Sequence, residues 1–304
     1  MSQTAAVIDL GTNTWHLLVG RFRQDGTLER LYHERRYVFL YSQGKDIIGP
    51  QPFGKAMEAI LHYKDKIDEM SVDLVVANGT EGLRKASNGQ DLLQEIAQET
   101  GIEVRLIDGH KEAQLTAQGI DIALKSLPSP PINQLVMDIG GGSVELLWRK
   151  DGQEQQLGSF PIGLGVMFPR FLAGERFDPS ECLDLRRWLA SYLRDFFQML
   201  SPADRPVLVG AAGTFEILAE VSDPGADRPP ALVLETEYLR PLLKQLMTNT
   251  LEERRQIPGI DEERLTMMPL AAYLVDYVLD FCDSEHVVVS RYGLKEGALK
   301  ELLL

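Results

Sequence analysis

A strand–turn–strand pattern occurs twice in this sequence, and the repeat restricts the possible folds more than any other feature. The first copy reads VIDLGTNT and contains Asp9, and the second reads VMDIGGGS and contains Asp138. Apolar runs flank both copies, and an Asp-Gly pair typical of hairpin turns follows each copy at a similar distance. Self-similarity on this scale predicts two domains of one fold that face each other across a cleft.

Strand-like and helix-like stretches alternate along the chain, which indicates the α/β class. In the first half we expect strands at residues 5–11, 14–22, 28–40, 73–80 and 102–108, and helices at residues 53–70 (after a break at Pro52), 81–101 and 110–127. In the second half we expect strands within residues 133–163, 206–213 and 286–290, and helices at residues 178–200, between residues 214 and 285, and at residues 294–304.

A cluster of three prolines gives the strongest signal for a domain boundary. Pro128, Pro130 and Pro131 lie between a predicted helix and the second copy of the repeated pattern. We therefore expect an N-terminal domain of residues 1–125, joined by the C-terminal helix 295–304, and a C-terminal domain of residues 126–294.

The composition excludes several classes of function. The formal net charge is −14, which disfavours nonspecific binding to the phosphate backbone of nucleic acids. The two cysteines, Cys182 and Cys282, lack metal-ligand spacing, so a reducing cytoplasm is the expected setting. The N-terminus lacks the basic and apolar regions of a signal peptide, and no stretch approaches the ~18 apolar residues of a membrane helix. We therefore predict a cytoplasmic protein without membrane or nucleic-acid partners.

The second copy of the pattern has three consecutive glycines, Gly140 to Gly142, between two apolar runs. Glycine weakens a strand, so a triple glycine indicates that another group must approach this backbone closely. A turn nearly free of side chains presents successive N–H groups that can wrap a phosphate oxygen. Asp138 and Glu145 flank the turn, and such acids can hold a cation or a water. A tight hairpin without a ligand is the alternative, and the matched first copy argues against it.

Segments along nearly the whole chain resemble, in order, the exopolyphosphatase / guanosine pentaphosphate phosphohydrolase family of the actin-like ATPase superfamily. They are IDLGTNTWHLLVG, GTEGLRKASNG, IDGHKEAQLTAQG, DIGGGSVEL, SFPIG, GAAGTFEIL, and the pair IPGI and GLKEGAL near the end. The resemblance implies two ribonuclease H-like (actin-like ATPase) domains around an interdomain cleft. It also implies hydrolysis of a phosphoanhydride bond with Mg²⁺ or another divalent cation.

Such hydrolysis needs a water aligned behind the terminal phosphorus, a base near that water, and charge neutralisation. By the resemblance, Glu112 is the catalytic base, and Glu145 is a second catalytic carboxylate that helps to hold the water or the metal. The implied metal ligands are Asp9, Asp138 and Glu145. From the residues alone, Glu112 has the alternative role of a first-turn acid that interacts favourably with the helix dipole. Lys111 stands where the family usually has another acid, so Glu112 is the only acid at these two positions that can act as the base.

The residues predicted to contact phosphate come from both glycine turns, one arginine and a third glycine segment. They are Gly11, Thr12, Asn13, Thr14, Arg84, Gly140, Gly141, Gly142, Ser143, Gly213 and Thr214. Arg84 has a planar fork that can grip two oxygens, although a solvated helix arginine is the alternative. Gly213 and Thr214 open a predicted helix, where N–H groups point at an anion. His16, within an apolar strand, and His110, at a variable position of the family, are not expected to be ligands.

Four positions depart from the pattern of the family. Phe39 and Tyr41 stand where arginine and glycine are expected, Val166 stands in place of an arginine, and Thr266 in place of an acid. The catalytic set is intact while outer substrate contacts are altered, so the reaction is better constrained than the substrate. A regulatory protein that binds a phosphorylated ligand with little or no turnover is the alternative function.

The chain stops at KEGALKELLL, whereas longer family members carry further C-terminal helical domains. A negative net charge would also repel a long polyanion outside the cleft. We therefore expect short polyphosphate or a phosphorylated guanine nucleotide such as guanosine pentaphosphate as substrate, with a homodimer as one option for assembly. A small-molecule kinase is less favoured because the Glu112 segment would lack a role, and a filament-forming actin relative because the inserted subdomains are missing.

Overall fold

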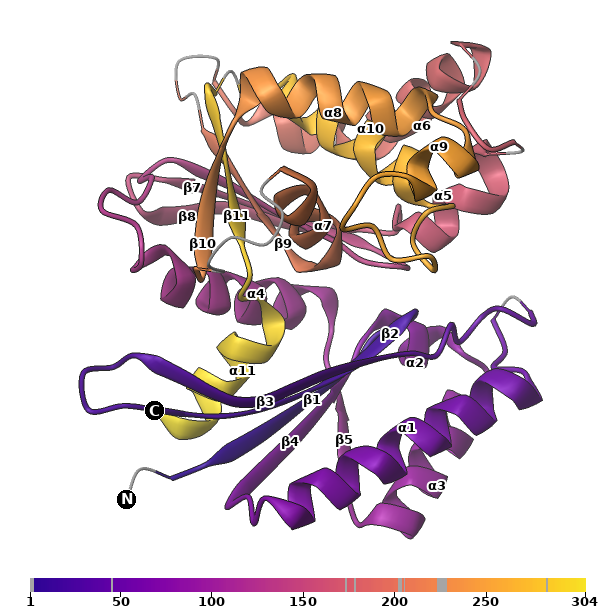
Figure 1. Ribbon diagram of the computed structural model, residues 1–304, viewed down its shortest axis with the longest axis vertical. Helices are drawn as coiled ribbons and strands as arrows, with labels where there is room; N and C mark the ends of the chain where they lie inside the picture. Colours follow the sequence, from indigo (N-terminus) through magenta and orange to yellow (C-terminus); the bar gives the residue numbers. More distant parts are fainter. Residues whose placement is uncertain are drawn as a thin grey trace. The chain divides into compact units, whose positions relative to one another are not determined.

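The computed structural model describes residues 3–44, 46–172, 174–177, 179–201, 204, 206–222, 229–282 and 284–304 (Figure 1). The chain folds into two compact units. The first unit comprises Met1–Ile122 and Gly293–Leu304, and the second comprises Ala123–Tyr292. The chain thus leaves the first unit once and returns to it for its final helix. Asp178, the predicted start of one helix, lies outside the described residues.

The first unit is built on a mixed sheet with the strand order β3-β2-β1-β4-β5. Its strands are β1 (Ala5–Leu10), β2 (Thr14–Phe22), β3 (Leu28–Tyr37), β4 (Leu74–Gly79) and β5 (Val104–Leu106). β1 pairs antiparallel with β2 and parallel with β4, so it is the central strand. This position explains its nearly unbroken apolar run, because a strand that is covered on both faces needs few polar side chains.

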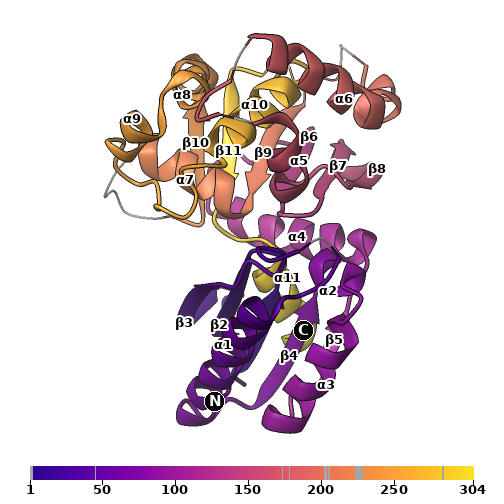
Figure 2. The same ribbon diagram turned by 90° about the vertical axis from the view of Figure 1, so that its right-hand side faces the viewer.

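Helices cover both faces of this sheet (Figure 2). They are α1 (Pro50–Glu69), α2 (Glu81–Lys85), α3 (Gly89–Thr100), α4 (Gly109–Leu124) and α11 (Leu294–Leu303). α1 and α3 pack side by side on one face, where Ile8, Trp15 and Tyr63 are fully buried in one core. α11 packs against β1 and β2 on the opposite face.

α4 and α11 cross with almost no space between their backbones. A Cβ at Gly119 would lie 1.9 Å from the carbonyl O of Gly293, and a Cβ at Gly297 would lie 1.8 Å from the carbonyl O of Leu115. Only glycine permits such an approach. The crossing therefore ties the C-terminal helix to the first unit through backbone contacts as well as side chains.

The second unit is built on a mixed sheet with the strand order β10-β11-β9-β6-β7-β8. Its strands are β6 (Gln134–Ile139), β7 (Val144–Lys150), β8 (Gln153–Phe160), β9 (Val207–Ala211), β10 (Ala231–Glu235) and β11 (His286–Ser290). β6 pairs antiparallel with β7 and parallel with β9, as β1 pairs with β2 and β4. The two sheets share this central topology, and the predicted α/β class with two sheets is confirmed.

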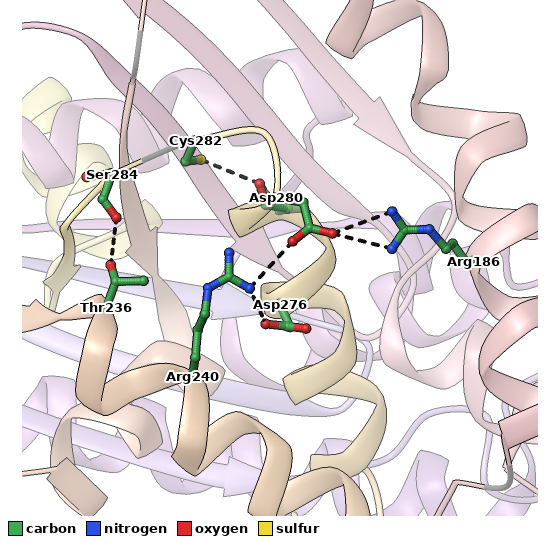
Figure 3. A network of polar contacts seen from close by, with 8 residues as sticks. Arg186, Thr236, Arg240, Asp276, Asp280, Cys282 and Ser284 are labelled. Atoms are coloured by element: carbon green, nitrogen blue, oxygen red, sulfur yellow. Dashed lines mark hydrogen bonds and ion pairs between the residues drawn. The ribbon is translucent and has the colours of Figure 1, made fainter. Parts of the chain in front are cut away.

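The helices of the second unit are α5 (Leu164–Phe171), α6 (Pro179–Gln198), α7 (Ala212–Ser222), α8 (Thr236–Thr248), α9 (Leu251–Arg255) and α10 (Met268–Leu279). An ionic network links three of them (Figure 3). Arg240 Nη1 of α8 lies 2.7 Å from Asp276 Oδ1 of α10 and 3.5 Å from Oδ1 of Asp280, which follows that helix directly. Arg186 Nη1 of α6 lies 3.4 Å from Asp280 Oδ2. Such half-exposed pairs contribute little energy singly, but together they align the helix layer.

Several elements differ from the sequence predictions. α1 begins at Pro50 and includes Pro52, because the first turn of a helix tolerates a residue without an N–H group. The helix expected over residues 81–101 is interrupted at Ala86, whose extended backbone separates α2 from α3. The strand expected over residues 28–40 ends at Tyr37. The sequence patterns did not predict α5 or β10, because an internal proline obscures the helical pattern of α5 and β10 has only five residues.

Candidate active site

The same backbone hydrogen bond closes both glycine turns. Gly11 N–H donates to the carbonyl O of Thr14 at 3.1 Å, and Gly140 N–H donates to the carbonyl O of Ser143 at 2.9 Å. A Cβ at Gly11 would lie 2.8 Å from the Thr14 oxygen, and a Cβ at Gly140 would lie 3.0 Å from the Ser143 oxygen. The first glycine of each turn is therefore required by the turn itself, whatever ligand the turn binds.

The start of α5 holds the triple-glycine turn from one side. Leu164 N–H donates to the carbonyl O of Gly140 at 3.0 Å, and Gly165 N–H donates to that of Gly141 at 2.8 Å. In a trans peptide the N–H group points opposite to the C=O group. The N–H groups of Gly141 and Gly142 therefore face away from α5, and two adjacent donors of this kind can cradle an anion.

The first turn is held in the same way by the segment that follows β3. Leu40 N–H donates to the carbonyl O of Thr12 at 2.9 Å, and Val38 N–H donates to that of Asn13 at 2.9 Å. By the same peptide geometry, the N–H groups of Asn13 and Thr14 face away from this segment. In each unit, then, the segment that follows the third strand of the sheet binds carbonyl groups of the glycine turn. The N–H groups of the same peptides point away from that segment.

Two of the positions that depart from the family pattern support the first turn. Phe39 adopts a positive φ of 47° and donates its N–H to the carbonyl O of Asn13 at 3.1 Å. The Tyr41 hydroxyl donates to the carbonyl O of Gly82 at 2.5 Å. Gly82 packs on the turn so closely that a Cβ there would lie 2.7 Å from Thr12 Oγ1. Tyr41 thus braces α2 against the first glycine turn.

The predicted base and the predicted phosphate clamp are neighbours in the first unit. Asp108 caps α4, since its Oδ1 accepts the N–H of Lys111 at 2.8 Å. This cap places Glu112 in the first turn of the helix. Arg84 of α2 donates Nη1 to the carbonyl O of Ile107, and the same Nη1 lies 3.9 Å from Glu112 Oε2. The Arg84 side chain is therefore not a freely solvated helix arginine.

Asp138 and Glu145 lie directly opposite each other in the register of β6 and β7, beside the triple-glycine turn. Glu145 is only 3% exposed, which excludes a solvent-facing role at a strand edge. Ser159 of β8 donates its hydroxyl to Glu145 Oε1 at 2.7 Å. The cross-strand register therefore brings two carboxylates together and fixes one of them.

These carboxylates suit a divalent cation by their chemistry. Mg²⁺ takes hard oxygen ligands and is usually held by one or two carboxylates, with waters and substrate phosphates completing its shell. A pair such as Asp138 and Glu145 fits this requirement. Within the described part of the chain, no group of three or more His, Cys, Asp or Glu side chains forms a ready-made metal cage.

Asp9 occupies the position in β1 that Asp138 occupies in β6, and the two strands have the same pattern of buried residues. Burial raises the pKa of Asp9 to about 6, an effect that Lys295 opposes and Glu296 reinforces. The carboxyl group is thus ionised at pH 7. A half-buried, ionised carboxylate of this kind suits a cation.

The third glycine segment lies in the first turn of α7, with Thr214 buried and Gly213 half-buried. The Arg264 guanidinium lies against Gly213, where a Cβ would be 2.0 Å from Arg264 Nη1. Sequence reasoning assigned no role to Arg264, although it closely precedes Thr266 in the altered stretch. Its proximity to a helix N-terminus is a tertiary feature and leaves no local signal in the sequence.

The candidate residues fall into two groups, one in each unit. The first unit holds Asp9, the turn 11–14, Arg84 and Glu112, and the second holds Asp138, the turn 140–143, Glu145, Gly213 and Thr214. Of the departures in the second unit, Val166 is half-buried within α5 and Thr266 is exposed.

Among the described helices, none is both long and apolar enough to cross a membrane.

Comparisons with known proteins match most of the chain to one family and to curated relatives. Residues 23–304 match the family described as the Ppx/GppA phosphatase family. The chain is 27% identical over 301 residues to "Exopolyphosphatase 1" of Mycobacterium leprae, covering 96% of this chain and 87% of that protein. It is 26% identical over 300 residues to a guanosine-5'-triphosphate,3'-diphosphate pyrophosphatase of Aliivibrio fischeri, covering 96% of this chain but only 58% of that protein.

Solved structures show the same fold over the full length. A crystal structure of an exopolyphosphatase from Cytophaga hutchinsonii matches with a TM-score of 0.90 at 31% identity, covering 99% of this chain and 98% of that one. The Ppx/GppA family member from Aquifex aeolicus matches with a TM-score of 0.82 at 22% identity, covering 100% of this chain and 98% of that one. The second likeness concerns the fold alone.

Proposed function

Since this chain belongs to the Ppx/GppA phosphatase family, we propose that it is a phosphoanhydride hydrolase that releases terminal phosphate from short polyphosphate or guanosine pentaphosphate. The observation that carries this proposal is the matched construction of the two glycine turns. Each turn is closed by the same hydrogen bond, from Gly11 to Thr14 and from Gly140 to Ser143, and directs successive N–H groups outward. Two cradles for phosphate oxygens suit a substrate with adjacent phosphates.

We assign the two turns to two domains, residues 1–125 with 295–304 and residues 126–294, and propose that both turns bind the same substrate. The shared topology of the two sheets supports this assignment. In the proposed complex the N–H groups of both turns, together with Thr214 and its helix N-terminus, neutralise the phosphate chain. Backbone donors of this kind explain how a protein with a net charge of −14 binds a polyanion.

Glu112 is the proposed base, and it accepts a proton from the water that attacks the terminal phosphorus. Its neighbour Arg84 is the proposed clamp, whose fork binds two oxygens of the same phosphate. The 3.9 Å separation of Arg84 Nη1 and Glu112 Oε2 supports these linked roles, because water and phosphate must lie side by side for the reaction. Glu145, held by Ser159, is the second proposed catalytic carboxylate.

Asp9, Asp138 and Glu145 are the proposed ligands of a divalent cation. Such a cation supplies positive charge to the phosphate oxygens on which negative charge accumulates. The protein contributes oriented carboxylates: Asp9 is half-buried and ionised at pH 7, and Glu145 is fixed by the Ser159 hydroxyl. Burial of these groups strengthens their interaction with a cation because water screens them less.

Phosphate release by the purified full chain tests the proposed function. Tripolyphosphate, long polyphosphate, guanosine pentaphosphate and ATP are compared, each with and without Mg²⁺, and the Glu112→Gln variant reports background. Mg²⁺-dependent release from tripolyphosphate or guanosine pentaphosphate is the expected result. Tight binding of these compounds without release would instead identify a regulatory protein. Cleavage of ATP only with an added acceptor would indicate a kinase.

A further inference from the structure

Lys295 is a buried lysine at the start of α11, with 9% of its surface exposed. Leu299 lies one turn later on the same helix face. Leu299 contacts β2 so closely that a Cβ at Gly20 would lie 3.0 Å from Leu299 Cδ2. Because the same face of the helix carries both residues, the Lys295 side chain is also directed at the sheet.

The residues near Lys295 belong to the end of the sheet that carries the first glycine turn. Asp9 and His16 are paired directly in β1 and β2, so their side chains lie on one face of the sheet. His33 stacks on His16 with ring centroids 5.7 Å apart. Lys295 interacts electrostatically with both Asp9 and His33. Its ammonium group therefore lies close to the end of β1, where the turn that begins at Gly11 follows.

The Lys295 ammonium group has no close protein partner in the described part of the chain. No described residue forms a hydrogen bond with its Nζ or places a carboxylate oxygen within 4.0 Å of it. The adjacent Glu296 is already engaged, because its Oε2 accepts the Gly293 N–H at 2.8 Å and its Oε1 lies 3.4 Å from Arg30 Nη2. An ammonium group has three donors, and no described residue accepts a hydrogen bond from those of Lys295. The carboxylate of Asp9 interacts with this ammonium group from more than 4.0 Å away, so the three donors of Lys295 are available to an added anion.

We propose that Lys295 is a substrate-binding residue whose ammonium group binds a phosphate oxygen of the phosphoanhydride held by the first glycine turn. This inference rests on the proposed hydrolase function. It assigns the C-terminal helix a part in the site, beside the cation ligand Asp9. A cation at Asp9 and an ammonium group at Lys295 would contact different oxygens of one phosphate chain, and both charges would stabilise the transition state.

The competing explanation is that Lys295 only offsets the half-buried charge of Asp9. The two explanations differ in what a substitution does to substrate binding. Lys295→Gln keeps a polar side chain but removes the charge, Lys295→Arg keeps the charge, and Lys300→Gln on the same helix is the matched control. The thermal midpoint of each variant reports folding. Binding of tripolyphosphate is measured by calorimetry without divalent cations, and phosphate release is measured with Mg²⁺.

If Lys295 binds the substrate, Lys295→Gln weakens tripolyphosphate binding about tenfold and lowers kcat/KM by about tenfold or more, while Lys295→Arg recovers most of both and Lys300→Gln changes neither. Unchanged binding in folded Lys295→Gln would overturn the inference, as would equal losses in Lys295→Gln and Lys295→Arg. If the wild type releases no phosphate from any compound, the hydrolase proposal fails, but the ratio of the two binding constants still decides the role of Lys295.

Discussion

Nη1 of Arg84 lies 3.9 Å from Oε2 of Glu112, although the two residues come from different helices and are separated in the sequence by the helix α3 and the strand β5. The guanidinium is held by its bond to the carbonyl O of Ile107, just before the capped start of α4. The proposed base and the proposed clamp are therefore fixed relative to each other within one unit. This pair provides the most direct tests of the proposed chemistry.

Replacing Glu112 with Gln separates chemistry from binding. The amide keeps the size and hydrogen bonding of the side chain but cannot accept the proton from water. We expect kcat to fall by about 10²-fold or more, with nearly unchanged affinity for tripolyphosphate. Steady-state phosphate release and calorimetry provide the two readouts. Glu99→Gln, at an exposed position of α3, is the control. A Glu112→Gln enzyme with normal turnover would show that another group activates the water.

Arg84→Lys should impair binding and turnover together. Lysine keeps the positive charge but replaces a planar, two-pronged donor with a point charge, so it loses the fork that can grip two phosphate oxygens while it is held at Ile107 O. We expect kcat/KM for tripolyphosphate to fall by about tenfold or more, and the dissociation constant for tripolyphosphate to rise. Lys85→Arg, on the same short helix, provides a control for charge and position. Retention of full affinity in Arg84→Lys would contradict the clamp assignment.

Gly163→Ala should disrupt the second glycine turn, although Gly163 itself is not a proposed substrate contact. A Cβ at Gly163 would lie 2.6 Å from Gly141 O and 2.5 Å from the Gly142 carbonyl carbon, so the turn must move. We expect a loss of about 1–3 kcal/mol in the free energy of unfolding, together with loss of tripolyphosphate binding. Urea unfolding and calorimetry measure the two effects.

Gly54→Ala is the matched control for that experiment. Gly54 lies inside α1, and a Cβ there would meet no atom within 4 Å. Alanine favours a helix over glycine, so this variant should gain about 0.5–1 kcal/mol. If Gly163→Ala were as stable and as competent in binding as the wild type, the support of the turn by α5 would not be required for ligand binding.

Asp9→Asn should stabilise the metal-free protein in a pH-dependent manner. Burial raises the pKa of Asp9 from 3.8 to about 6, so the folded state binds the proton more tightly than the unfolded state. The contribution of Asp9 to stability therefore falls as the pH rises from about 4 to about 6, and the full penalty, of the order of 3 kcal/mol, persists above that range. Asparagine removes the charge and with it this penalty.

Urea unfolding in EDTA between pH 4 and pH 8 measures that difference. Asp9→Asn should be more stable than the wild type at pH 8 and nearly equal to it at pH 4, while losing Mg²⁺-dependent phosphate release. Asp65→Asn, at an exposed position of α1, is the control. A constant or inverted difference across this pH range would show that burial does not penalise the Asp9 charge.

Local patterns in the sequence predicted most of the elements that carry the candidate site. The strands around Asp9 and Asp138, the hairpins that follow them, and the helix of Glu112 all depend on hydrophobic period and turn residues close together in the chain. Elements without such signals were missed. α5 contains an internal proline, and a short break at Ala86 divides a helix that has a continuous apolar pattern.

The sequence by itself determined the duplicated turns and their acids, because a glycine turn between two strands needs only neighbouring residues to form. Tertiary structure alone decided which groups surround those turns. The hydrogen bonds of α5 to the turn at Gly140, the proximity of Arg84 to Glu112, the packing of Arg264 on Gly213 and the approach of Lys295 to Asp9 all join segments far apart in the chain. Such contacts depend on how sheets and helices pack. Packing between distant segments produces no local sequence pattern, so the sequence does not predict which residue contacts which.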